Sequence, residues 1–169
     1  MTTKHNRKST PEPTTSPYRW HLFQHLPLYT TRLVRETDFT FPAREQLCTP
    51  ADVAAVLQEY FRDRDREEFL VCLLDMANTL IGLACVSVGG LAASIVEPRQ
   101  VFKVAILANA AAVILAHNHP SGNPEPSWED IRVTRNLVEA GKLMGLPIHD
   151  HLIITDCGYT SLAERGLLP

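Results

Sequence analysis

The sequence has no run of 18 consecutive apolar residues, so we expect no transmembrane helix. Its first 20 residues also lack the apolar segment of a secretory signal peptide, and we therefore expect a cytoplasmic protein. Basic residues are not in excess, since 16 Lys and Arg stand against 19 Asp and Glu, for a formal net charge of -3. Proteins that bind nucleic acid usually carry a basic face, so this charge balance does not favour DNA binding.

Closely spaced cysteines are also absent. The four cysteines have no Cys-x-x-Cys spacing and stand apart at Cys48, Cys72, Cys85 and Cys157. Cys72 and Cys85 lie within apolar runs, where a free cysteine behaves as a small hydrophobic residue. We therefore predict reduced, structural thiols. Without Cys-x-x-Cys or His-Glu-x-x-His, the motifs of zinc deaminases and of helical zincins are excluded.

The chain divides into three parts by composition. Residues 1–18 are rich in Ser, Thr, Pro and Lys with almost no large apolar residue, which predicts a disordered tail. Residues 19–48 form an N-terminal extension in which the partly alternating LPLYTTRLVRE predicts a possible edge strand. Residues 49–169 carry most of the apolar periodicity, and we predict that they form one domain.

Within this domain, apolar periodicity and turn residues predict alternating helices and strands. Thr49-Pro50-Ala51-Asp52 has the pattern of a helix start, with a hydroxyl cap, a proline in the first turn and an acid three residues after the cap. Two apolar stretches separated by a turn predict an antiparallel hairpin. The expected strands are 69–74, 80–88, 110–116, 147–155 and 159–162, and the expected helices are 50–61, 99–109 and 127–144. This order predicts an α/β fold, with a mixed sheet flanked by helices on both sides.

The apolar run 110–116 ends abruptly in His117-Asn118-His119-Pro120. Side chains two apart on a strand point to the same side, so the two imidazoles could converge. A turn-rich loop then leads to Ser127 and Asp130, which by themselves are an ordinary helix capping box. Two imidazoles and one carboxylate would leave one position of a tetrahedral zinc ion open, as in catalytic sites. Neither motif is specific alone, but together they indicate a metal site.

This arrangement resembles the motif of the JAB/MPN (JAMM) metalloprotease superfamily. The longer strings HNHPSGNPEPSWED and REEFLVCLLD, together with LPIHDHLIIT, are similar to its RadC-like branch, and the resemblance covers roughly residues 50–169. It implies a JAB/MPN-like (cytidine-deaminase-like) fold. It also implies that Zn²⁺ is the cofactor and that its ligands are His117, His119 and Asp130.

The resemblance also implies roles for residues around the metal. The superfamily uses a glutamate at the start of an upstream strand as the catalytic base; the match falls on Glu67, with its neighbour Glu68 as the alternative. Ser127 would help to hold the oxyanion, a role compatible with capping the helix. Ser121 is interpreted as a turn residue rather than a nucleophile, because no base is spaced to activate it.

A second His-x-His, formed by His149 and His151 around Asp150, is interpreted either as packing or as a segment in which Asp150 or His151 orients a ligand or a loop, and not as further metal ligands. Two functions remain open at this point. The first is a zinc-dependent metallopeptidase or isopeptidase that hydrolyses an amide bond of a peptide or protein substrate. The second is a RadC-like binding module with a DNA-linked role, in repair or in mobile elements, and no proteolysis.

Overall fold

The structure is a computed structural model that describes residues 30–34, 49–89 and 96–169. The expected tail over 1–18 lies outside the described residues, and so does the expected extension over 19–48 except for residues 30–34, which form neither helix nor strand. The chain divides into two compact units, Met1–Thr31 and Arg32–Pro169, and the second contains every described helix and strand. Within the described residues, no helix has the length and apolarity needed to cross a membrane.

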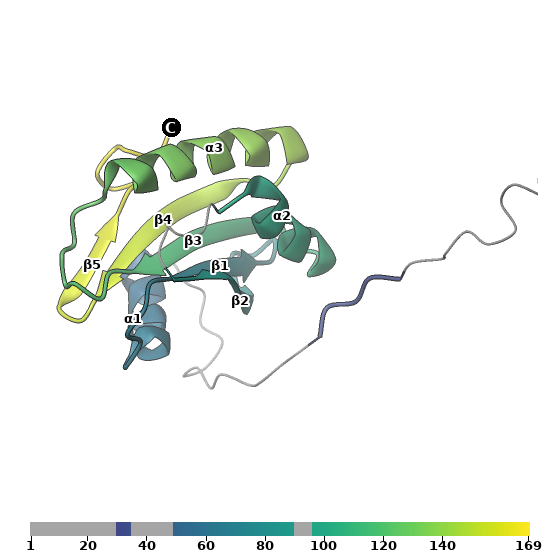
Figure 1. Cartoon of the computed structure of the whole chain (residues 1–169). Coiled ribbons are helices and arrows are strands. Elements are labelled where there is room, and N and C mark those ends of the chain that lie inside the picture. Colours follow the sequence, from purple (N-terminus) through teal and green to yellow (C-terminus); the bar gives the residue numbers. More distant parts are fainter. Residues whose placement is uncertain (1–29, 35–48, 90–95) are drawn as a thin grey trace, which may run out of the picture. The chain divides into compact units, whose positions relative to one another are not determined.

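Three helices and five strands make up the second unit (Figure 1). In chain order they are α1 (Pro50–Phe61), β1 (Glu68–Leu74), β2 (Leu80–Val88), α2 (Pro98–Leu107), β3 (Ala112–Asn118), α3 (Trp128–Met144), β4 (Ile148–Thr155) and β5 (Gly158–Ser161). The strands form one sheet in the order β2-β1-β3-β4-β5. Only the β3/β4 pair is parallel among these strands, so the sheet is mixed and the predicted fold class is confirmed.

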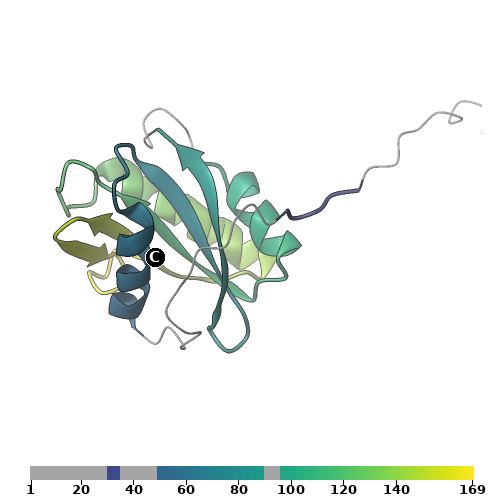
Figure 2. The same cartoon turned by 90° about the horizontal axis from the view of Figure 1, so that it is seen from below.

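The sheet has a helix layer on each face (Figures 1 and 2). Strand side chains alternate between faces, and every residue of β1 and β3 is buried because both faces are covered. In β1, Phe69 and Val71 belong to the core that includes residues of α2 and α3, whereas Leu70 and Cys72 belong to the core that includes residues of α1. The continuous apolar runs in the sequence are therefore strands with helices packed on both faces.

The strand pairing brings three segment ends to one edge of the sheet. Because β1 runs antiparallel to β3, the start of β1 lies beside the end of β3, with Phe69 opposite His117. The connection from β3 to its parallel neighbour β4 contains α3. The first turn of α3 returns to the end of β3, where Asp130 lies beside His117. Residues around positions 67, 117 and 130 are thereby brought together although they lie up to 63 positions apart.

The first turn of α3 is fixed by a reciprocal cap. The Ser127 hydroxyl oxygen accepts a hydrogen bond from the Asp130 N–H at 3.1 Å, and the Asp130 Oδ2 accepts one from the Ser127 N–H at 2.6 Å. Capping boxes of this kind satisfy backbone donors that have no partner within the helix. At the other end, Gly145 adopts a left-handed φ of 67° that stops the helix. The capping box between Ser127 and Asp130 therefore also fixes the backbone position of Asp130.

The described cysteines differ sharply in accessibility, which gives a direct test of the core. Cys72 is fully buried in β1, and burial raises the pKa of its thiol to about 12. Because the thiolate is the reactive form, Cys72 should resist alkylation by iodoacetamide at pH 8, whereas the exposed Cys157 should react in the native protein. Peptide mapping by mass spectrometry before and after unfolding would measure both sites. Equal labelling rates of Cys72 and Cys157 in the native protein would contradict this packing.

Candidate metal centre

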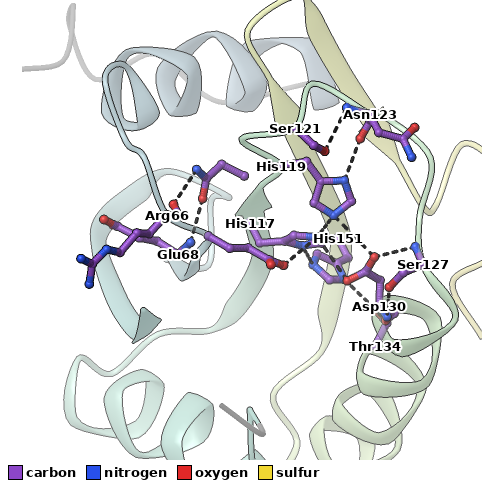
Figure 3. A network of polar contacts seen from close by, with 12 residues as sticks. Arg66, Glu68, His117, His119, Ser121, Asn123, Ser127, Asp130, Thr134 and His151 are labelled. Atoms are coloured by element: carbon purple, nitrogen blue, oxygen red, sulfur yellow. Dashed lines mark hydrogen bonds and ion pairs between the residues drawn. The ribbon is translucent and has the colours of Figure 1, made fainter. Parts of the chain in front are cut away.

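The side chains of His117 and His119 converge at the end of β3 (Figure 3). Their Nε2 atoms lie 3.0 Å apart, and the two rings meet edge-on with centroids separated by 4.7 Å. His117 is completely buried, whereas the side chain of His119 keeps 15% of its surface exposed. The predicted convergence of the two imidazoles is therefore present, with His119 just beyond the last residue of the strand.

Asp130 completes this cluster from the first turn of α3. Its Oδ1 lies 3.2 Å from the Nε2 of His117, and its Oδ2 lies 3.7 Å from the Nε2 of His119. Burial favours the neutral acid, but the two facing imidazoles outweigh it and hold the pKa of Asp130 well below its ordinary value. Conversely, Asp130 raises the pKa of His119. Among the described residues, the buried Oδ1 has no hydrogen-bond partner, which is costly for a carboxylate oxygen and favours a cation beside it.

The spacing of these three groups fits a divalent ion. With zinc–nitrogen and zinc–oxygen distances of about 2.0–2.2 Å, two ligand atoms of a tetrahedral site lie roughly 3.3 Å apart. The distances among the two imidazole nitrogens and the carboxylate oxygens, 3.0, 3.2 and 3.7 Å, bracket this value. Two imidazoles and one carboxylate are also a donor set suited to zinc. The three residues therefore fit the metal that the sequence analysis expects.

Glu67 is the fourth acidic or imidazole side chain in this cluster. Its Oε1 lies 4.0 Å from the Nε2 of His117, and one ligand atom from each of the four residues falls within 4.8 Å of the others. Its side chain keeps 27% of its surface exposed, in contrast to the buried Asp130. Glu67 therefore lies beside the three closely packed groups, on a side that solvent reaches.

Glu68, the alternative base, is held elsewhere. Its carboxylate accepts a hydrogen bond from the Tyr60 hydroxyl at 3.2 Å and pairs with Arg64 at 3.4 Å. Because Tyr60 lies in α1, Glu68 points to the face of the sheet that α1 covers. Of the two acids, the structure brings only Glu67 to the histidines.

Asn118, to which the sequence analysis assigns no role, links the end of β3 to the backbone around Glu67. Its Oδ1 accepts a hydrogen bond from the Glu68 N–H at 2.7 Å, and its Nδ2 donates one to the Arg66 carbonyl at 2.9 Å. The single amide therefore binds the backbone on both sides of Glu67, while its chain neighbours are the two histidines. The sequence signal for this role is its position between His117 and His119. Successive side chains of a strand point to opposite sides, so Asn118 is expected to point away from the two imidazoles.

The loop after the histidines orients His119. The His119 Nδ1 contacts the backbone carbonyl of Asn123 at 2.7 Å, and the Gly122 N–H donates to the His119 carbonyl at 2.9 Å. Ser121 contributes a hydroxyl that accepts from the Asn123 N–H at 3.4 Å. These contacts within the loop form a turn, and Ser121 lies in that turn.

The second His-x-His segment lies on β4, and its members have different surroundings. His151 is fully buried, with its Nε2 2.9 Å from the Nδ1 of His117 (Figure 3). Desolvation, together with the neighbouring His117, lowers the pKa of His151 well below the ordinary value. Asp150 accepts hydrogen bonds from the His151 and Ala163 N–H groups and from the Ser161 hydroxyl, whereas His149 is exposed and contacts Asn78.

An open hollow lies beside the cluster. It has a volume of about 460 Å³ and is lined by Arg66, Glu67, Gly89 and Pro120. Glu67 thus lines the hollow and also belongs to the metal cluster. Together, the mixed sheet, the paired imidazoles and the buried carboxylate define an α/β domain with a candidate metal centre at one sheet edge.

The comparisons with known proteins identify the family. The RadC-like JAB domain matches residues 47–167, and the chain therefore belongs to the RadC-like JAB domain family, which confirms the resemblance. A UPF0758 protein of Salinibacter ruber is 61% identical over 125 residues, covering 74% of this chain and 54% of the relative. UPF0758 proteins of Moorella thermoacetica and Methanosarcina acetivorans are 52% and 47% identical, over 75% and 77% of this chain and 55% and 57% of each relative. The chain thus spans about half the length of these relatives.

Proposed function

We propose that this chain is a zinc-dependent metallopeptidase or isopeptidase that hydrolyses an amide bond with a metal-activated water molecule. The observation that carries the proposal is the convergence of two imidazoles and one buried carboxylate, with a partly exposed glutamate beside them. Three protein ligands are the number found in catalytic zinc sites, whereas structural sites use four. Membership in the JAB family supports a hydrolase.

The roles of the protein groups follow from their positions. His117, His119 and Asp130 would hold the ion, which would supply a water with a pKa of about 7 and a Lewis acid for the carbonyl. Glu67 would take a proton from the attacking water as the carbon–oxygen bond forms. It would then pass that proton to the amine nitrogen as the carbon–nitrogen bond breaks, so that one carboxylate serves as base and then acid.

Ser127 would contribute to the stabilisation of the oxyanion. Its Oγ already accepts a hydrogen bond from the Asp130 N–H, but accepting uses an oxygen lone pair and not the hydroxyl hydrogen. The hydroxyl can therefore cap α3 and still donate to a developing negative charge beside Asp130. Capping and oxyanion binding are compatible, as the sequence analysis expects.

Removing the metal should abolish hydrolysis. We expect the purified chain to contain about one zinc ion per molecule, measured by elemental mass spectrometry, because the donor set is preformed. Hydrolysis of fluorogenic peptides and of lysine-isopeptide probes should fall to background after dialysis against a chelator. It should return with Zn²⁺ but not with Mg²⁺, which prefers oxygen ligands. A chain without stoichiometric metal, or one that stays active when verified metal-free, would contradict the proposal.

The same preparation distinguishes the DNA-linked alternative. A binding module without proteolysis would leave every probe intact and would shift duplex or single-stranded DNA in a salt-dependent manner. The formal net charge of -3 gives no support to that outcome. We expect no shift at physiological salt concentration.

A further inference from the structure

A buried row of polar groups connects two of the proposed ligands behind the cluster. The Thr134 Oγ1 donates a hydrogen bond to the backbone carbonyl of Asp130 at 2.6 Å, and it lies 2.5 Å from the Nδ1 of His151. The Nε2 of His151 lies 2.9 Å from the Nδ1 of His117. Thr134, His151 and His117 are all 0% exposed, so solvent cannot substitute for any of these partners.

The direction of each hydrogen bond in this row is determined by its first member. A backbone carbonyl can only accept, so the single hydroxyl hydrogen of Thr134 is used on Asp130. The Thr134 oxygen must then accept from His151, which places a hydrogen on the Nδ1 of that ring. In the tautomer of His151 with its hydrogen on Nδ1, Nε2 carries no hydrogen and can only accept. The donor it meets is the Nδ1–H of His117.

We propose that Thr134 and His151 are positioning residues that keep the hydrogen of His117 on Nδ1 and so leave its Nε2 lone pair directed at the metal. This inference rests on the proposed role of His117 as a ligand. In the opposite tautomer, the hydrogen on Nε2 would point at Asp130 Oδ1, 3.2 Å away, and would occupy the position that the ion needs. The row therefore selects the form of His117 that can bind metal.

The two ligand histidines are held in different ways. A backbone carbonyl, that of Asn123, faces the Nδ1 of His119 and requires no further partner. His117 depends instead on a neutral side chain, whose own tautomer has to be set by Thr134. This dependence makes the control of His117 sensitive to substitution at position 134, which is one helical turn after Asp130.

A first experiment measures the tautomers in the unmodified protein. Long-range ¹H–¹⁵N correlation spectra of the full chain, recorded metal-free, distinguish protonated from bare imidazole nitrogens. We expect His151 to carry its hydrogen on Nδ1 with a bare Nε2, and His117 to carry a hydrogen on Nδ1. A hydrogen on the Nε2 of His151 would overturn the inference, and no substitution that risks the fold is involved.

A second experiment measures zinc affinity by competition with a chromophoric chelator. Thr134→Val keeps the shape of the side chain but removes the acceptor for His151, and we expect a 10- to 100-fold weaker affinity. Thr134→Ser retains the hydroxyl and serves as the matched control, with affinity close to the unmodified chain. The spectra of Thr134→Val should show the His151 hydrogen moved to Nε2. Unchanged affinity and tautomer in a folded Thr134→Val variant would also overturn the inference.

The two experiments separate this inference from the proposed function. If the unmodified chain fails to bind zinc but shows the expected tautomers, the proposed function is wrong and the hydrogen-bonded row remains as described. If zinc binds tightly while His151 carries its hydrogen on Nε2, the metal site stands and the positioning role is wrong.

Discussion

Replacing Glu67 with glutamine should lower the rate of amide hydrolysis by a factor of about 10²–10⁴ while leaving the bound zinc unchanged. This is the contribution expected of a general base that also acts as an acid, and glutamine can accept no proton in either role. Metal content should persist because the Glu67 Oε1 stands 4.0 Å from the His117 Nε2, outside the closest contacts of the three ligands. Initial rates and zinc content would be measured on the same preparation.

Glu68→Gln is the matched control for this substitution, since it makes the same chemical change one residue later. The Glu68 carboxylate is bound by Tyr60 and Arg64 on the α1 side of the sheet, away from the histidines. We therefore expect it to retain most of the hydrolytic rate. A rate for Glu67→Gln equal to that of the unmodified chain, or an equal loss in both variants, would contradict the assignment of Glu67 as the base.

Replacing Asp130 with asparagine should eliminate stoichiometric zinc and with it the stabilisation that zinc provides. At a free zinc concentration 100 times its Kd, a ligand that binds only the folded state raises the free energy of unfolding by about 2.7 kcal/mol. The unmodified chain should show that increase. In Asp130→Asn the amide replaces an anionic ligand by a neutral group whose NH₂ would face the imidazole nitrogens, so added zinc should change the unfolding free energy little.

The fold itself should survive this substitution. The amide oxygen can still accept the hydrogen bond from the Ser127 N–H, and the amide hydrogens give the buried His117 Nε2 a donor. The variant also removes the buried Oδ1, which has no hydrogen-bond partner in the part of the chain that the structure describes. Urea unfolding with and without zinc would test both statements, with Glu129→Gln, an exposed acid of the same turn, as the control. Equal zinc stabilisation of Asp130→Asn and the unmodified chain would remove Asp130 from the ligand set.

Local signals predicted most of the helices and strands correctly. Thr49 and Ser127 mark helix starts because their side chains accept hydrogen bonds from backbone N–H groups of the first turn. Gly145 marks a helix end because it adopts the left-handed conformation that stops the helix. The strand predicted over 110–116 was displaced by two residues, to Ala112–Asn118. Its polar end continues the strand because His117 and Asn118 find buried partners that an apolar pattern does not reveal.

The sequence by itself determined the helix starts at Thr49 and Ser127, the doubly covered strands and the His-x-His motif, because each depends on residues that are close along the chain. Tertiary structure alone decided which glutamate joins the histidines. The strand pairing places the start of β1 beside the end of β3, where Glu67, the residue before β1, reaches the histidines. Glu68 is instead held by Tyr60 on the side of α1. Tertiary structure also brought Thr134 and His151 behind His117 and placed Asn118 against the backbone around Glu67. These contacts depend on the register of strands far apart in the chain, which no local pattern encodes.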